Sequence, residues 1–203
     1  MTPSDAERFA VAYAAIRQGE QWAERDRARR ATAVARTVDS MRAELGANAT
    51  IASVGAGAMR VPGVIAVDLL APANVRADMR ALPFADGAID GAVYAASLHY
   101  AELGESVPEA ARVLRGGGLL AVIDSPIYFG QPDATAAAAR SAAYYARAGH
   151  PELAAFYHPL EAGALRATLA QNRFEMVELT AGSRWRRLLR RGPRSFVLAR
   201  KLR

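Results

Sequence analysis

The sequence predicts an α/β fold of the doubly wound type, built on a mostly parallel sheet. Short apolar runs that end at glycine or aspartate alternate with helical segments, and each run is too short to be a helix. Buried parallel strands have this pattern because helices cover both faces of their sheet. In such sheets ligands bind beyond the carboxyl ends of the strands, so functional residues are expected directly after each strand.

Two helices are expected before the first strand. Apolar residues recur at three- and four-residue spacing from Phe9 to Ile16 and again from Val34 to Leu45. We expect both helices on the outside of one domain, 1–203, in which residues 1–47 form the N-terminal helices and residues 48–203 form the α/β core.

Strands and helices alternate in the rest of the chain. The expected strands are Ile51–Val54, Val64–Val67, Val75–Ala77, Gly91–Tyr94, Leu119–Ile123, Phe174–Leu179 and Phe196–Leu202. The expected helices are Glu105–Leu114, Ala134–Arg147 and Leu160–Gln171, the first of them stopping at a turn of three glycines, Gly116–Gly118.

The connections between the first three strands are short. Only ten residues separate Gly57 from Asp68, and Pro62 and Gly63 lie among them. The connection from Asp68 to Asp78 is no longer. Because a parallel crossover normally needs a dozen or more residues including its helix, the first two crossover helices are expected to be missing.

Composition excludes several classes of protein. The absence of cysteine rules out a disulfide scaffold, a thiolate zinc site and a cysteine nucleophile, and it permits a cytoplasmic location. No apolar run reaches the ~20 residues of a membrane span. No cluster of histidine and acidic residues has metal-ligand spacing, so no metal site is expected.

The net charge of +6 comes from one segment. The last twenty residues carry +9, and the rest of the chain sums to −3, which does not predict a specific nucleic-acid binder. The arginine-rich segment Arg184–Arg194, which includes Trp185, either contacts an acidic partner or is a solvated loop. Its lack of an amphipathic period favours the loop.

Two spaced motifs point to a known family. One, Asp-x-x-x-Leu-Pro-Phe-x-Asp-x-x-x-Asp, runs from Asp78 to Asp90, and the other, Glu-Ala-Ala-Arg-Val-Leu-Arg-Gly-Gly-Gly, begins at Glu109 and leads into the strand that closes on Asp124. In order and register, residues 51–126 resemble the class I S-adenosylmethionine-dependent methyltransferases, in particular the type 11-like group that acts on small molecules.

The resemblance implies a Rossmann-like methyltransferase fold of seven strands with a late antiparallel hairpin, and S-adenosylmethionine as the cofactor. It also implies a role for each candidate residue. Gly55 and Gly57 would hold the methionine part, Asp68 the ribose, and Asp78 with the Met79 backbone the adenine amino group. Ser97, His99 and Tyr100 would face the transferred methyl group, with Ser97 counted among the cofactor-binding residues and His99 and Tyr100 as catalytic.

His99 is the best candidate for a general base, because the ordinary histidine pKa of ~6.5 allows it to accept a proton at neutral pH. A packed or capping role for His99 is equally open. The predicted function is methyl transfer to an unidentified small-molecule acceptor. The alternative is a degenerate methyltransferase-like protein that has lost the cofactor and acts as a binding or scaffolding partner, which the short connections favour. A dinucleotide-binding protein of the NAD type is set aside, because the full glycine fingerprint is lacking.

Overall fold

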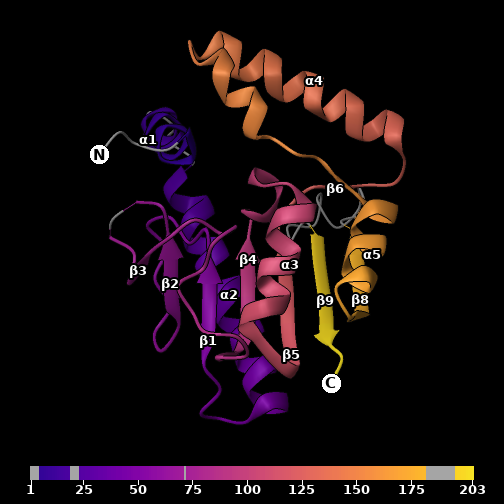
Figure 1. Ribbon diagram of the computed structural model, residues 1–203. Coiled ribbons are helices and arrows are strands. Elements are labelled where there is room, and N and C mark those ends of the chain that lie inside the picture. The colour runs from indigo at the N-terminus through magenta and orange to yellow at the C-terminus, as the bar shows by residue number, and fades with distance from the viewer. Residues whose placement is uncertain (1–4, 19–22, 71, 182–194) are drawn as a thin grey trace.

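A seven-stranded sheet organises the molecule (Figure 1). The computed structural model describes residues 5–18, 23–70, 72–181 and 195–203. The strand order is β3-β2-β1-β4-β5-β9-β8. The strands are β1 (Ile51–Val54), β2 (Ile65–Asp68), β3 (Val75–Arg76), β4 (Ile89–Ala95), β5 (Leu114–Ile123), β8 (Phe174–Ala181) and β9 (Ser195–Lys201).

The pairing of the strands confirms the predicted fold class. Strands β1 to β5 pair in parallel, and β9 pairs antiparallel with both β5 and β8, so that β8 and β9 form the late antiparallel hairpin. A second, two-stranded sheet joins β6 (Ile127–Tyr128) to β7 (Leu160–Glu161). The sequence did not predict this small sheet, and β7 takes the first two residues of the helix expected from Leu160.

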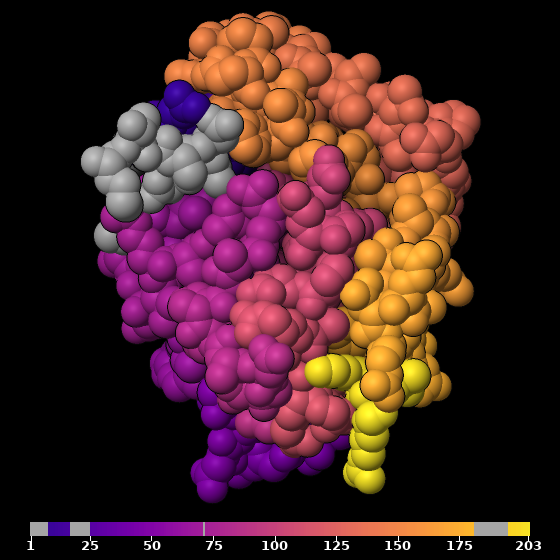
Figure 2. Space-filling view, viewed as in Figure 1, coloured from indigo at the N-terminus to yellow at the C-terminus, as the bar shows by residue number. Residues whose placement is uncertain are grey.

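Helices cover both faces of the sheet. The described α-helices are α1 (Asp5–Gln18), α2 (Ala23–Leu45), α3 (Leu103–Val113), α4 (Gln131–Arg147) and α5 (Ala162–Gln171), and the short 3-10 helices are η1 (Leu98–Tyr100) and η2 (Pro151–Phe156). In Figure 1, α3 and α5 lie in front of the sheet and α2 lies behind it, whereas α1 and α4 lie above the carboxyl ends of the parallel strands. Figure 2 shows the orange α4–η2 segment as a cap over the body of the protein.

The first two crossover helices are absent, as predicted. Neither the stretch from Gly57 to Asp68 nor the described part of the stretch from Asp68 to Asp78 contains a helix. Between β1 and β2 the chain turns instead, and Met59 packs into a buried cluster with Val34 of α2. Helix α2 therefore packs one side on the sheet, where it covers part of the face that a crossover helix normally covers.

The three glycines after α3 do not form the expected turn. Strand β5 begins directly at Leu114, and its pairing with β4 shifts register between Ile89 and Gly91. Leu114 lies opposite Ile89 and Leu119 opposite Gly91, so the glycines form a large bulge inside the strand. Helix α3 consequently ends at Val113, one residue earlier than predicted.

Candidate functional site

A cavity of about 470 Å³ lies at the carboxyl ends of the parallel strands. This volume is within the range of about 300–1,000 Å³ that is typical of small-molecule sites. Its walls come from α1, α2, the turns that follow β1 to β4, η1 and η2. All six residues predicted to bind the cofactor line it, namely Gly55, Gly57, Asp68, Asp78, Met79 and Ser97.

The glycine turn after β1 brings two strand ends into close contact. Gly55 has φ +68°, and a Cβ atom at this position would lie 2.4 Å from the Cβ of Ser97. The Ser97 hydroxyl is itself fixed, because it donates a buried hydrogen bond of 2.6 Å to the carbonyl of Val54. Gly57 also has a positive φ, +55°, but no atom lies within 4 Å of its Cβ position. Of these two glycines, Gly55 is the one that close packing requires.

The carboxylate of Asp68 keeps acceptor capacity for a ligand. Its Oδ2 accepts a hydrogen bond of 2.7 Å from the Gly57 amide, and its Oδ1 accepts one of 3.1 Å from the Leu70 amide. A carboxylate has about four acceptor positions, two on each oxygen. One position on each oxygen of Asp68 therefore remains, which matches the two hydroxyls of a ribose diol.

Asp78 is more heavily engaged. The backbone amide and Nε of Arg80 both donate to its Oδ1, at 2.9 and 3.1 Å, and Nη2 of Arg80 donates to its Oδ2 at 2.7 Å. Partial burial raises the pKa of Asp78, but these hydrogen bonds outweigh it and hold the pKa below the ordinary value. About one acceptor position on Oδ2 remains, enough for a single N–H donor such as an amino group.

His99 does not line the cavity, although it follows β4 as the sequence suggested. It is buried, with Nδ1 3.2 Å from the Ser125 hydroxyl. Burial, together with the nearby Arg30 and His158, lowers the pKa of His99 to about 3. The ring is therefore neutral near pH 7, and it does not border the cavity.

Tyr100 lines the cavity and belongs to an aromatic wall that the sequence did not predict. Its hydroxyl donates to that of Tyr13 at 2.8 Å, and its ring centroid lies 5.2 Å from that of Phe9. Phe156 of η2 completes the wall, 4.8 Å from Phe9. Burial, followed by the neighbouring Tyr13 and Tyr145, raises the pKa of Tyr100 well above its ordinary value. The periodicity of α1 identified a buried face, but not that this face looks into a cavity.

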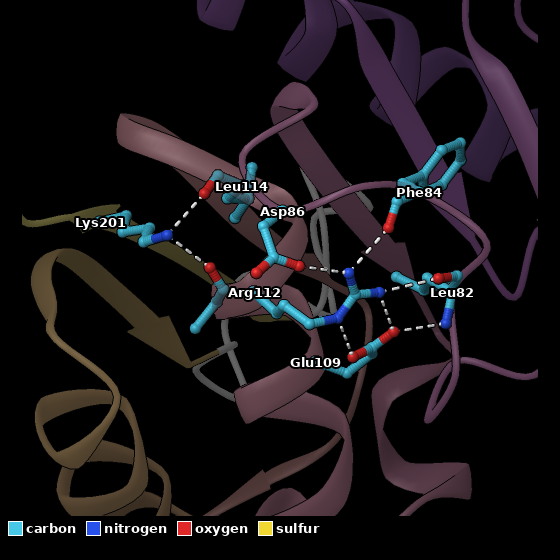
Figure 3. Close-up of polar contacts among 8 residues, drawn as sticks. Leu82, Phe84, Asp86, Glu109, Arg112, Leu114 and Lys201 are labelled. Carbon is cyan, nitrogen blue, oxygen red and sulfur yellow. Dashed lines mark hydrogen bonds and ion pairs between the residues drawn. The ribbon is translucent and has the colours of Figure 1, made fainter.

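The two family motifs contact each other directly (Figure 3). Arg112 of α3 pairs with Glu109 through Nε and Nη2, at 2.8 and 2.7 Å, and with Asp86 through Nη1 at 2.8 Å. The same guanidinium donates to the carbonyls of Phe84 and Leu82 at 2.8 and 2.9 Å, while Glu109 accepts from the Leu82 amide at 2.5 Å. These contacts hold the segment after β3 on α3, so Asp86, Glu109 and Arg112 of the two motifs have a structural role.

Three further expectations concern the arginine-rich segment, membrane spans and metal sites. The arginine-rich segment proposed to contact an acidic partner falls within residues 182–194, outside the described part of the chain. None of the helices described is long and apolar enough to cross a membrane. Nor do the described residues include three histidine, cysteine or acidic side chains grouped to hold a metal ion.

Comparison with solved structures shows the same fold. The 1,6-didemethyltoxoflavin-N1-methyltransferase of Burkholderia thailandensis, solved with 1,6-didemethyltoxoflavin and S-adenosylhomocysteine, matches with a TM-score of 0.63 and 17% identity over 100% of this chain and 93% of that one. A SAM-dependent methyltransferase of Methanosarcina mazei matches with a TM-score of 0.51 and 18% identity, over 76% and 92%.

A further match is a putative methyltransferase of Haloferax volcanii, solved in complex with the activator Trm112. Its TM-score is 0.59 and its identity 13%, over 90% of this chain and 95% of that one. No curated protein has significant sequence similarity to this chain. A family model described as "hypothetical methyltransferase" matches residues 8–131, more than half of the sequence. The chain therefore belongs to this methyltransferase family, and its fold is that of the class I SAM-dependent methyltransferases.

Proposed function

We propose that the protein transfers a methyl group from S-adenosylmethionine to a small-molecule acceptor. The observation that supports this most directly concerns Asp68 at the end of β2. Each of its carboxylate oxygens can still accept one hydrogen bond from a ligand. This capacity suits a ribose diol, and Asp78 at the end of β3 retains about one position for the adenine amino group. Both carboxylates line a cavity of suitable size.

The bound cofactor would supply an electrophilic methyl group on a sulfonium, and the protein's contribution would be to bind and align. Gly55 and Gly57 let a ligand approach the backbone at the end of β1, and Ser97 borders the same space at the end of β4. Holding two reactants in a near-attack geometry can remove a large share of the activation barrier in transfer reactions of this kind.

On the acceptor side, Tyr100 and the rings of Phe9, Tyr13 and Phe156 favour a ligand with an apolar or flat surface. We assign Tyr100 to contact with the acceptor, through its ring. His99 would act through Tyr100, because their ring centroids are 4.2 Å apart and His99 itself does not reach the cavity. The lowered pKa of His99 and the raised pKa of Tyr100 both oppose a role as general base near pH 7.

Calorimetric titration with S-adenosylhomocysteine tests the cofactor assignment. The unmodified protein should bind it, and Asp68→Ala should weaken binding about tenfold or more, because a hydrogen bond to a charged group contributes roughly 1.5–3 kcal/mol. Asp39→Ala is the matched control: it removes an exposed carboxylate on α2 that does not line the cavity, and should leave affinity unchanged. The proposal would be refuted if the unmodified protein did not bind at about millimolar ligand. A Kd of about 1 mM corresponds to a binding free energy of roughly −4 kcal/mol.

One observation favours the alternative of a degenerate, cofactor-free binding protein. No helix follows the glycine turn of β1, so the helix N-terminus that often stabilises an anionic ligand group in such folds is missing. The same titration separates the two functions, since a scaffolding protein would not bind S-adenosylhomocysteine.

We further propose that residues 1–203 act as one domain, because α1 and α2 line the cavity together with the α/β core. A cysteine-free sequence suits the reducing cytoplasm, where we place the protein.

A further inference from the structure

The side of α2 that packs on the sheet carries apolar side chains. Above the sheet, the same side of the helix carries two arginines. Val34, Val38 and Met41 are almost fully buried, at 0%, 1% and 2% exposure. Arg30 and Arg27 precede them at spacings of four and three residues, so all five residues share one side of the helix. Both arginines line the cavity at the carboxyl ends of the strands. Where α2 passes beyond the edge of the sheet, its inner face therefore changes from apolar to cationic.

The two arginines are held differently. Arg30 pairs with Asp26 one turn earlier on α2, and its Nε lies 3.9 Å from Asp124, just beyond β5. Asp26 and Asp124 also pair with Arg29, each at 2.8 Å. The negative charges of Asp26 and Asp124 therefore balance the positive charges of Arg29 and Arg30. Arg27 is exposed and forms no ion pair with another described residue, so it brings a positive charge to the cavity that those carboxylates do not neutralise.

The other charges around the cavity lie on the opposite side. Its acidic lining residues are Asp68 and Asp78, at the ends of β2 and β3. The strand order is β3-β2-β1-β4-β5, and Arg30 approaches the end of β5. A ligand with its adenine at β3 and its ribose at β2 would extend its remaining part past β1 and β4, toward Arg30 and Arg27. In S-adenosylmethionine that part ends in an amino group and a carboxylate.

We propose that Arg27, supported by Arg30, forms a carboxylate subsite that holds the amino-acid end of the cofactor. It would supply the positive charge that a crossover helix N-terminus otherwise provides, from a helix that precedes β1 in the sequence. This inference rests on the proposed function and adds to it the element that compensates for the missing helix.

The test compares two ligands that differ at this end. S-adenosylhomocysteine carries the carboxylate, whereas 5′-methylthioadenosine has the same adenosine and sulfur but no amino-acid part. Arg27→Gln should weaken binding of S-adenosylhomocysteine about tenfold and change binding of 5′-methylthioadenosine less than about twofold. Because Arg27 forms no ion pair with another described residue, the variant should fold normally, which a thermal melt verifies.

Arg36→Gln is the matched control. Arg36 is exposed on the same helix and does not line this cavity, so its replacement makes the same charge change without affecting either ligand. Equal binding of S-adenosylhomocysteine by Arg27→Gln, Arg36→Gln and the unmodified protein would overturn the subsite and leave the proposed function standing. Equal weakening of both ligands by Arg27→Gln would overturn it too. Failure of the unmodified protein to bind either ligand would refute the proposed function as well.

Discussion

Replacement of Gly55 by alanine should destabilise the protein much more than replacement of Gly57. Both glycines have positive φ, so alanine at either position costs about 1–2 kcal/mol of backbone strain. At Gly57 nothing else is disturbed, because no atom lies within 4 Å of the new Cβ. At Gly55 the new Cβ would be 2.4 Å from that of Ser97, whose hydroxyl is bound to Val54. Overpacking of this kind adds about 1–3 kcal/mol, giving a total of about 2–5 kcal/mol.

Urea unfolding of the two single variants measures the difference. A third variant, Ser97→Gly, and its combination with Gly55→Ala complete a double-mutant cycle. If the clash with Ser97 is the cause, the combined variant should be more stable than the sum of the two single effects predicts. Equal destabilisation by Gly55→Ala and Gly57→Ala, or strict additivity in the cycle, would show that close packing at the end of β1 is not the reason for glycine at position 55.

The dependence of stability on pH gives two further predictions, one for Glu109 and one for His99. Hydrogen bonds from Arg112 hold the pKa of Glu109 below its ordinary value of 4.5, so the stability that Glu109 contributes is complete above that pH and is lost as the pH falls through the lowered pKa. Glu109→Gln should therefore reduce the free energy of unfolding near pH 7, by a margin that shrinks in acid; a constant margin would contradict this. His99, with its pKa lowered from 6.5 to about 3, should make the protein lose stability as the pH falls below 6.5, because the unfolded chain then binds a proton that the folded protein does not. Urea unfolding of His99→Gln should show a weaker pH dependence in this interval, and an unchanged dependence would count against a buried neutral ring.

The strands were the most predictable part of the fold. Ile51–Val54 was predicted with its observed bounds, because four consecutive buried residues in a central strand leave an uninterrupted apolar run. The absent crossover helices were equally predictable from chain length and from Pro62. The β6–β7 pair was not, since each of its strands has two residues and no periodicity can show in so short a segment.

The site was less predictable from the sequence than the strands, as Ser97, His99 and Tyr100 illustrate. Sequence reasoning placed all three after β4, but it could not tell which of them face the cavity. Leu98–Tyr100 forms a turn of 3-10 helix, in which successive side chains point about 120° apart. Tyr100 consequently lines the cavity while its neighbour His99 contacts Ser125. A position directly after a strand is therefore insufficient to identify a catalytic group.

The shortened connections and the N-terminal helices are best understood together. Loss of the first crossover helix would expose one face of β1 and remove a positive helix end from the cavity. Helix α2 meets the first need with Val34 and Val38, which pack in one cluster with Ile51 of β1. In the proposed subsite, Arg27 on the same side of α2 meets the second. The face of β1 and the charge at the cavity would then depend on a single helix, whose register links them. A spacing of seven residues from Arg27 to Val34, two helical turns, is what places charge at the cavity and apolar side chains on the sheet.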